Sequence, residues 1–314
     1  MKRLEGTPKA DGFRMPGEFE RHQGCYIIWP ERPDNWRNNA KDAQEVFYEL
    51  IKIISSYEKI VLGVSNINEF DSKKFKFNDN VEIVEIKHND SWARDTGPIG
   101  LVNDKGEHRA SIFGFNAYGG EKEGLYFAWN LDRKIAKEMC KNEKMDYYDT
   151  SSMVLEGGSV VTNGKGTLIT TKECLLNKNR NPLLTQEKIE ERLKKYMGVE
   201  KIIWLNKGIV NDETNGHVDN ICNFVKEDEV VLAWPKDEND EQYAVSLENY
   251  NILVNSTTAD GKPIKVHKLI LPDVLRITKE ESEGVLAKAS TQPRLEGDRM
   301  AASYVNMLVS DKYV

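Results

Sequence analysis

The chain has 314 residues and a formal net charge of −7, because 51 acidic side chains outnumber 44 basic ones. An acidic protein repels polyanions, so this balance argues against a nucleic-acid partner. No apolar stretch approaches the roughly 20 residues of a membrane span, and no apolar run follows the basic N-terminus as it would in a signal peptide. The composition therefore predicts a protein without a membrane or nucleic-acid partner, and it leaves a homo-oligomer open.

The cysteines are too far apart in the sequence to indicate a disulfide framework or a zinc knuckle. None belongs to a C-x-x-C pair, and they stand at Cys25, Cys140, Cys174 and Cys222. Isolated cysteines of this kind are typical of reduced thiols in the cytoplasm. We therefore expect a cytoplasmic protein whose thiols are free.

Short β-rich runs alternate with amphipathic helices along the chain. Strands are predicted at 25–29, 59–64, 81–86, 98–102, 110–115, 159–162, 167–170, 201–205, 221–225, 230–234, 264–271 and 301–309. Apolar residues at helical spacing predict helices over 40–57, 130–141, 186–197 and 243–254. The recurring unit is two or three strands with one helix, which indicates an α/β fold made of weak repeats.

No linker rich in proline, glycine or serine interrupts this pattern, so residues 1–314 are predicted to form a single domain. A doubly wound nucleotide-binding sheet is disfavoured, since neither G-x-G-x-x-G nor G-x-x-x-x-G-K-[ST] follows a predicted strand. The glycine pairs at 119–120 and 157–158 are too short to cradle a diphosphate.

The densest group of polar residues is the run Glu-Thr-Asn-Gly-His-Val-Asp-Asn at 213–220. Its Asn-Gly dipeptide favours a type I′ turn, because both residues tolerate positive φ. A strand is then predicted over 218–225, with His217 and Asp219 on the same face. An imidazole beside a carboxylate suits proton transfer at a cationic substrate or the ligation of a metal. An ordinary hairpin with polar residues in water is the simpler alternative for this stretch alone.

Three further stretches carry candidate residues. Asp90, Trp92 and Asp95 lie in the run Asn-Asp-Ser-Trp-Ala-Arg-Asp-Thr-Gly-Pro, and Glu156 precedes a Gly-Gly turn. The run at 25–37 leads from a strand into a turn rich in proline and tryptophan. Each stretch also has an ordinary structural interpretation: a capped turn with a surface Arg–Asp pair, a loop, and a core strand with a packed loop.

Taken together, these stretches closely resemble the agmatine deiminases. The runs W-A-R-D-T-G-P, L-E-G-G-S and E-T-N-G-H-V-D-N occur in the order of that family. The run W-P-E-R-P-D-N-W-R favours the agmatine deiminases over the related bacterial peptidylarginine deiminases. The resemblance extends from about residue 15 to the last residue. It implies the pentein fold, a five-bladed β/α propeller of ββαβ modules, with the last module incomplete in this chain.

The resemblance also implies a hydrolase that deiminates agmatine to N-carbamoylputrescine and ammonia, without a metal or cofactor. Asp95 and Asp219 would hold the planar guanidinium by charge-assisted hydrogen bonds. Glu156 would contact the guanidinium or orient His217, which would transfer protons. A cysteine thiolate would attack the guanidinium carbon and form a covalent thiouronium intermediate.

The other end of agmatine is an ammonium group, and three residues are candidates to bind it. We expect Trp92 to offer a cation–π face. Asp90 or Glu213 would supply the counter-charge.

The sequence departs from the family pattern in two places. Tyr118 stands where family members commonly carry tryptophan in F-N-A-W-G-G, and it adds a hydroxyl group. The family's nucleophile segment, G-G-G-N-x-H-C near the C-terminus, does not occur in the sequence. We therefore expect the nucleophilic cysteine to lie beyond residue 314, and the 314-residue chain alone to be inactive.

Two alternatives remain. An inactive guanidine-binding fragment fits the lack of a matching cysteine. A non-haem Fe(II) oxygenase would use His217, Asp219 and His267 in the H-x-D…H arrangement of a 2-His-1-carboxylate triad. Those oxygenases have a double-stranded β-helix, and the repeated long helices predicted here argue against it.

Overall fold

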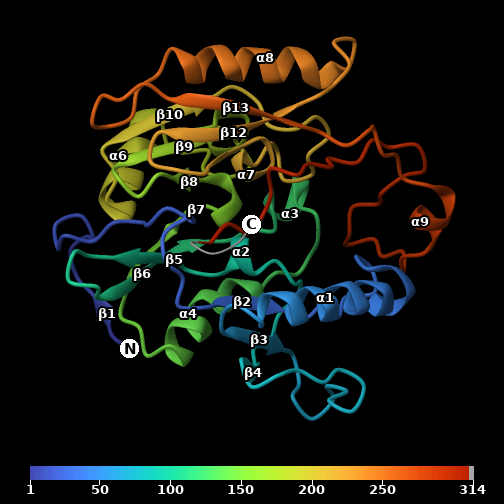
Figure 1. Ribbon diagram of the computed structural model, residues 1–314. Coiled ribbons are helices and arrows are strands. Elements are labelled where there is room, and N and C mark those ends of the chain that lie inside the picture. Colours follow the sequence, from blue (N-terminus) through green and yellow to red (C-terminus); the bar gives the residue numbers. More distant parts are fainter. Residues whose placement is uncertain (311–314) are drawn as a thin grey trace.

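The computed structural model describes residues 1–310, and its strands form four small sheets with long helices packed around them (Figure 1). The first sheet is all parallel, in the order β2-β3-β4. Its elements are β2 (Cys25–Ile28), α1 (Lys41–Ile54), β3 (Ile60–Val64) and β4 (Val81–Glu85). Ile51 and Ile54 of α1 are buried against this sheet, because they lie on one face of the helix.

The other three sheets share one topology, in which two antiparallel strands are followed by a helix and a third strand parallel to the second. The second sheet has β5 (Ile99–Val102), β6 (His108–Gly114), α4 (Asp132–Asn142) and β7 (Tyr147–Val154), with β1 (Arg3–Leu4) added beside β7. The third has β8 (Val161–Thr162), β9 (Thr167–Thr171), α6 (Gln186–Met197) and β10 (Lys201–Leu205). The fourth has β11 (Cys222–Phe224), β12 (Glu229–Trp234), α8 (Glu241–Val254) and β13 (Lys265–Ile270).

The helix α6 shows how local sequence fixes such a unit. The Thr185 side chain accepts a hydrogen bond from the Lys188 backbone N–H and caps the first turn. Gly198 ends the helix at φ 65°, a left-handed conformation that favours glycine. Between these ends the buried residues Ile189, Leu193 and Met197 recur every four positions and pack in the core beneath the third sheet.

Short helical turns connect one sheet to the next. The turn α2 (Ala93–Thr96) lies between the first two sheets, η2 (Gly157–Ser159) between the second and third, and α7 (Val218–Ile221) between the third and fourth. Both α2 and α7 pack against η2, and Figure 1 shows α2 and α7 in the middle of the molecule. The remaining short elements are η1 (Arg37–Ala40), α3 (Gly120–Glu123), α5 (Lys172–Leu175) and α9 (Lys279–Glu283).

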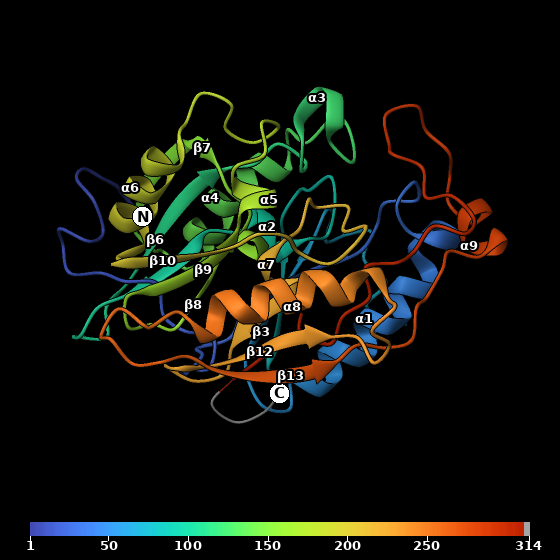
Figure 2. The same cartoon turned by 90° about the horizontal axis from the view of Figure 1, so that it is seen from above.

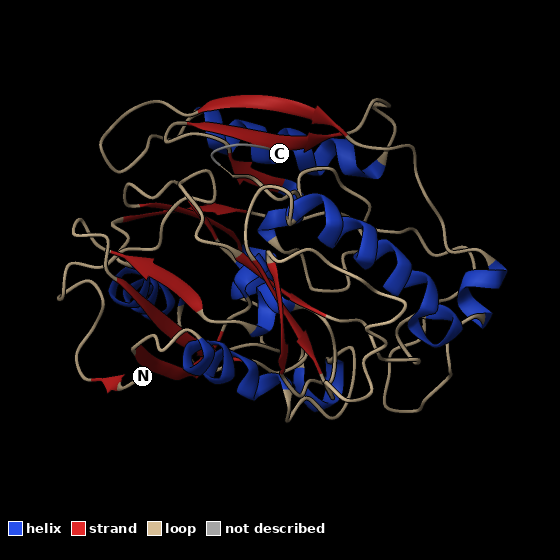
Figure 3. Cartoon of the chain, turned by 60° about the horizontal axis from the view of Figure 1, so that its bottom comes forward, coloured by secondary structure: helices blue, strands red, loops and turns tan. Residues whose placement is uncertain are grey.

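Seen from above, α8 lies along the outside of β12 and β13, while α1 crosses a different part of the surface (Figure 2). With helices and strands coloured separately, the strands fall into separate groups with long helices beside them (Figure 3). The α/β class predicted from the sequence is thus confirmed. None of the helices in the described residues is long and apolar enough to cross a membrane.

Two strand predictions were wrong. The segment 218–225 begins as α7 and becomes a strand only at Cys222. The cause is the Asp212 carboxylate, which accepts hydrogen bonds from the backbone N–H of His217 and the side-chain amide of Asn220, so that the chain turns before the strand begins.

The second wrong prediction is the strand over 301–309, which has no regular secondary structure. Its apolar residues do not alternate across one sheet face. Instead, Val305 belongs to the core of the fourth sheet, and Leu308 packs against the core of the first. The segment therefore crosses from one core to another.

Candidate active site

The predicted residues Asp95, Glu156, His217 and Asp219 all come from the three connections between sheets. Asp95 is in α2, and Glu156 is the residue directly before η2. His217 directly precedes α7, and Asp219 is in it. Because these turns pack against one another, they bring residues far apart in the sequence into one group, in which Glu156, His217 and Asp219 are buried and Asp95 is partly buried.

Gly158 marks the point on which three of these side chains converge. A Cβ atom added to Gly158 would lie 2.5 Å from Nδ1 of His217, 2.7 Å from Oδ2 of Asp219 and 2.9 Å from Oδ1 of Asp95. Any side chain at this position would collide with them. Glycine therefore lets two carboxylates and an imidazole face one small volume.

Neighbouring donors hold Asp95 in place. Its Oδ1 accepts a hydrogen bond from the backbone N–H of Gly158 at 2.8 Å, and its Oδ2 accepts one from the Tyr118 hydroxyl at 2.9 Å. Nδ1 of His217 lies 3.8 Å from Oδ1. Tyr118, noted above for its departure from the family's tryptophan, thus uses its extra hydroxyl to orient a predicted clamp residue.

Glu156 forms a fully buried ion pair with Arg180. Nε of Arg180 donates to Oε1 of Glu156 at 2.8 Å, and neither side chain is exposed. The remaining guanidinium hydrogens of Arg180 are bound by neighbours that include the backbone carbonyls of Tyr118 and Thr214. Oε2 of Glu156 faces Nε2 of His217 at 3.8 Å, which places Glu156 to orient the imidazole.

Burial and charge shift the pKa values of these groups in different directions. Burial raises the pKa of Asp219 to about 7, and the nearby charge of Asp95 adds to that effect. Burial alone would raise the pKa of Glu156, but the charges of Arg180 and His217 hold it below its usual value. Burial alone would lower the pKa of His217, yet Asp95, Cys174 and Glu156 together raise it well above the usual value. The group therefore favours a protonated imidazole and ionised Glu156.

The residues predicted to bind the substrate ammonium lie in a separate network. The Asp90 carboxylate is buried and accepts hydrogen bonds from Asn35, Trp36, Trp92 and the Ser91 backbone N–H. Trp92 stays partly exposed, and its ring lies 5.5 Å from that of Trp36. Glu213 is paired with Arg294 through two hydrogen bonds of 2.6 and 2.8 Å. The structure thus shows the three predicted residues with their polar atoms already bound.

The iron triad His217, Asp219 and His267 is not assembled. His267 lies on β13, where its Nε2 contacts Oε2 of Glu229 at 2.6 Å and the side chain is partly exposed. Among the described residues, the one group of three potential metal ligands with donor atoms within 4.8 Å is Glu156, Cys174 and His217. The oxygenase alternative is therefore wrong, because its third ligand sits on a strand that turns it toward solvent.

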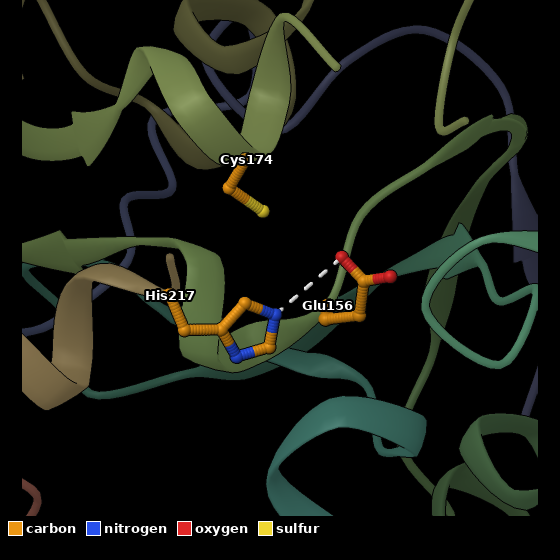
Figure 4. Close-up of side chains that lie close together, drawn as sticks. All are labelled: Glu156, Cys174 and His217. Carbon is orange, nitrogen blue, oxygen red and sulfur yellow. Dashed lines mark ion pairs between the residues drawn. The ribbon is translucent and has the colours of Figure 1, made fainter. Parts of the chain in front are cut away.

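Sequence reasoning missed two residues at this site, Cys174 and Arg180. Cys174 is fully buried in α5, and Figure 4 shows its Sγ directed toward the space between His217 and Glu156. The sequence offers little to identify it, since it stands in an ordinary turn after a strand. Arg180 is equally hard to identify, because its burial follows from its ion pair with Glu156, and the sequence does not show that these two residues meet.

Comparison with known proteins gives a consistent result along nearly the whole chain. The family model of Porphyromonas-type peptidyl-arginine deiminases matches residues 14–314. A protein of Latilactobacillus sakei is 53% identical over 306 residues, which are 98% of this chain and 84% of that protein. An agmatine deiminase of Pseudomonas aeruginosa is 46% identical over 310 residues, which are 98% of this chain and 84% of that enzyme.

Solved structures agree with these relatives. An agmatine deiminase of Enterococcus faecalis superposes with a TM-score of 0.94 at 42% identity, covering 99% of this chain and 85% of that one. A C. jejuni agmatine deiminase with a cysteine replaced by serine and substrate bound has a TM-score of 0.78 at 27% identity, covering 95% and 80%. With the site geometry, these matches show that the chain belongs to the family of Porphyromonas-type peptidyl-arginine deiminases.

Proposed function

We propose that the protein is an agmatine deiminase, which hydrolyses agmatine to N-carbamoylputrescine and ammonia. The observation that carries this proposal is the convergence of Asp95, Asp219 and His217 on Gly158. Two carboxylates facing one small volume suit a planar cation that donates hydrogen bonds from both edges. The named relatives support agmatine as the substrate, because they share both the family and the fold.

Asp95 and Asp219 act as the clamps that hold the guanidinium flat. Asp219 supports this role with Oδ1, which is buried and has no hydrogen-bond partner in the protein. An unpartnered buried acceptor is costly, so a ligand that donates hydrogen bonds there is favoured. The cationic substrate also favours the ionised form of Asp219.

His217 is the proton carrier, and Glu156 holds it in position. The raised pKa of His217 favours the imidazolium, which can protonate the departing ammonia. The resulting neutral imidazole can then accept a proton from the water that hydrolyses the thiouronium. These steps use side chains of the protein alone, and we propose that the reaction needs no metal or cofactor.

The nucleophile is a cysteine thiolate, and the substrate-bound relative with a cysteine replaced by serine supports that chemistry. Cys174 is a poor candidate. Figure 4 shows it with Glu156 on the Nε2 side of the His217 ring, whereas Gly158 faces Nδ1. Burial also raises its pKa, which disfavours the thiolate. That none of the four cysteines in the sequence is the nucleophile stays a prediction.

Trp92, Asp90 and Glu213 are proposed to bind the ammonium end of agmatine. The support is their chemistry and their grouping around Asn35, whose side chain donates to Asp90 and accepts from Arg294. The partly exposed Trp92 ring offers a face to a cation.

We also propose that the four sheets belong to one domain and to a five-module propeller. Three sheets already have the ββαβ order, and residues 301–309 run between the fourth and first cores. A cytoplasmic location and a homo-oligomer remain expectations from the sequence.

Ammonia release tests the proposed function. The assay compares agmatine with arginine, using the 314-residue chain and a chain extended with the downstream coding sequence. We expect the extended chain alone to release ammonia, and agmatine to be the better substrate. Equal rates for the two chains would show that one of the four internal cysteines is the nucleophile, and Cys-to-Ser variants would identify which one. No deimination by either chain would refute the proposal.

A further inference from the structure

Three buried side chains behind the proposed guanidinium site have the character of metal ligands. A carboxylate oxygen of Glu156, Sγ of Cys174 and a ring nitrogen of His217 all lie within 4.8 Å of one another. Each of these residues is at most 2% exposed. Figure 4 shows the three side chains pointing toward one another from different elements.

Two of the donor atoms in this group lack hydrogen-bond partners. Oε2 of Glu156 and Nε2 of His217 are buried, and neither has a hydrogen-bond partner in the protein. With His217 protonated they form an ion pair at 3.8 Å, the dashed line in Figure 4, which is too long for a hydrogen bond. Buried polar atoms are normally paired, so this space is better explained by something that binds both.

The groups behind the ligands are also arranged as at metal sites. Arg180 holds Glu156 through Oε1, which leaves Oε2 free. Asp95 lies 3.8 Å from Nδ1 of His217, on the side of the ring opposite Nε2. The hydrogen bond from Arg180 orients the Glu156 carboxylate as outer groups orient the ligands at protein metal sites, whereas Asp95 acts on His217 through its charge alone.

We propose that Glu156, Cys174 and His217 form a binding site for a thiophilic divalent cation of the Zn²⁺ and Cd²⁺ type. Sulfur and imidazole donors favour such cations over Mg²⁺ and Ca²⁺, which prefer oxygen alone. Three protein ligands leave a fourth position for water. When the cation binds, the Cys174 thiol and the His217 imidazolium each lose one proton to solvent.

A cation here would act on the reaction as an inhibitor, and this consequence rests on the proposed function. Nε2 of His217 would be occupied, and Glu156 would no longer orient the imidazole. The added positive charge would also repel the substrate guanidinium. The site is therefore distinct in role from a catalytic metal centre.

The test measures metal binding without using activity. The 314-residue protein, free of metal and kept reduced, is dialysed against Cd²⁺, and bound metal is counted together with the ultraviolet charge-transfer band of Cd²⁺–thiolate. We expect one equivalent of Cd²⁺ and the band. Cys174→Ser should weaken binding by at least about tenfold and abolish the band.

A matched control is Cys222→Ser, because Cys222 is another fully buried free thiol but belongs to no such group. It should bind Cd²⁺ as the unmodified protein does. His217→Gln should weaken binding while leaving the thiol in place, and circular dichroism checks that each variant is folded. Unchanged binding in both Cys174→Ser and His217→Gln, or no binding by the unmodified protein, would overturn the proposal. Because no turnover is measured, either result is separable from failure of the deiminase assignment.

Discussion

The two ends of the proposed substrate site differ in whether their carboxylates already have partners. At the guanidinium end, Oδ1 of Asp219 and Oε2 of Glu156 are buried without a hydrogen-bond partner. At the ammonium end, Asp90 is surrounded by donors and Glu213 is paired with Arg294. Both ends carry negative charge, but only one retains unused buried acceptors.

This difference indicates where a ligand contributes most binding energy. A guanidinium that reaches Asp219 donates to an acceptor for which the protein supplies no donor. No hydrogen bond within the protein is therefore broken when the ligand binds there. An ammonium that reaches Glu213 must share that carboxylate with Arg294, in a partly exposed ion pair of small worth. We therefore expect the guanidinium end to determine catalysis and the other end to adjust affinity.

The largest effect is expected for Asp95→Asn and Asp219→Asn, made in a chain that is active. Each change removes a charged acceptor from a buried site. We expect kcat/KM for agmatine to fall about 10²–10³-fold, or about 3–4 kcal/mol. Asp260→Asn is the control, because that residue is exposed and is not part of the proposed site. Near-normal turnover by either variant would remove that residue from the clamp.

The second effect concerns pH. Burial raises the pKa of Asp219 to about 7, and a cation binds the ionised form. Agmatine affinity, measured by calorimetry, should therefore fall up to about tenfold per pH unit below 7 and level off above it. The free energy of unfolding of the ligand-free protein should change in the opposite direction. The folded state binds the Asp219 proton more tightly than the unfolded state does. Asp219 therefore lowers the free energy of unfolding as the pH rises from about 4 to about 7.

Asp219→Asn should flatten both pH profiles, because an amide does not ionise in this range. An unchanged pH profile in this variant would assign the dependence to another group, with His217 the first to examine.

A smaller effect is expected at the ammonium end. Glu213→Gln should raise the KM for agmatine by roughly tenfold, while costing under about 1 kcal/mol of stability as the pair with Arg294 is partly exposed. The matched substrate is butylguanidine, which keeps the guanidinium and lacks the ammonium. Its KM should not change. Equal changes for both substrates would show that Glu213 does not recognise the ammonium.

The smallest effect is expected for Tyr118→Phe. The change removes the hydroxyl that donates to Oδ2 of Asp95 but keeps the buried ring. We expect a loss of about 0.5–1.5 kcal/mol, seen as a severalfold decrease in kcat/KM with the fold intact. No change in kcat/KM would mean that the Gly158 N–H alone orients Asp95.

The sequence was a good guide wherever apolar spacing decided the structure. The helix 186–197 was predicted with its observed bounds, because its caps and apolar face all lie within a few residues. The turn at Asn215 and Gly216 has the predicted positive φ values. The following strand began late because the Asp212 side chain binds the turn, and such a contact leaves no periodic signal.

The candidate site shows the same limit. The positions of Asp95, Glu156, His217 and Asp219 came from motifs that resemble a known family, and the structure brings them together. Cys174 and Arg180 could not be recognised in the same way, because neither lies in those motifs. Their places are set by the packing of separate elements around η2, and no local pattern encodes that packing.

The segment that contains Val305 and Leu308 has a consequence for how the molecule unfolds. One of these side chains belongs to the core of the fourth sheet and the other packs on the core of the first. When either core opens, the segment loses its contacts on that side. The side chain that packs in the other core is then held less firmly and becomes more exposed to solvent. The first and fourth sheets, which are far apart in the sequence, are therefore energetically coupled, and we expect their backbone amides to exchange with solvent in a single cooperative event.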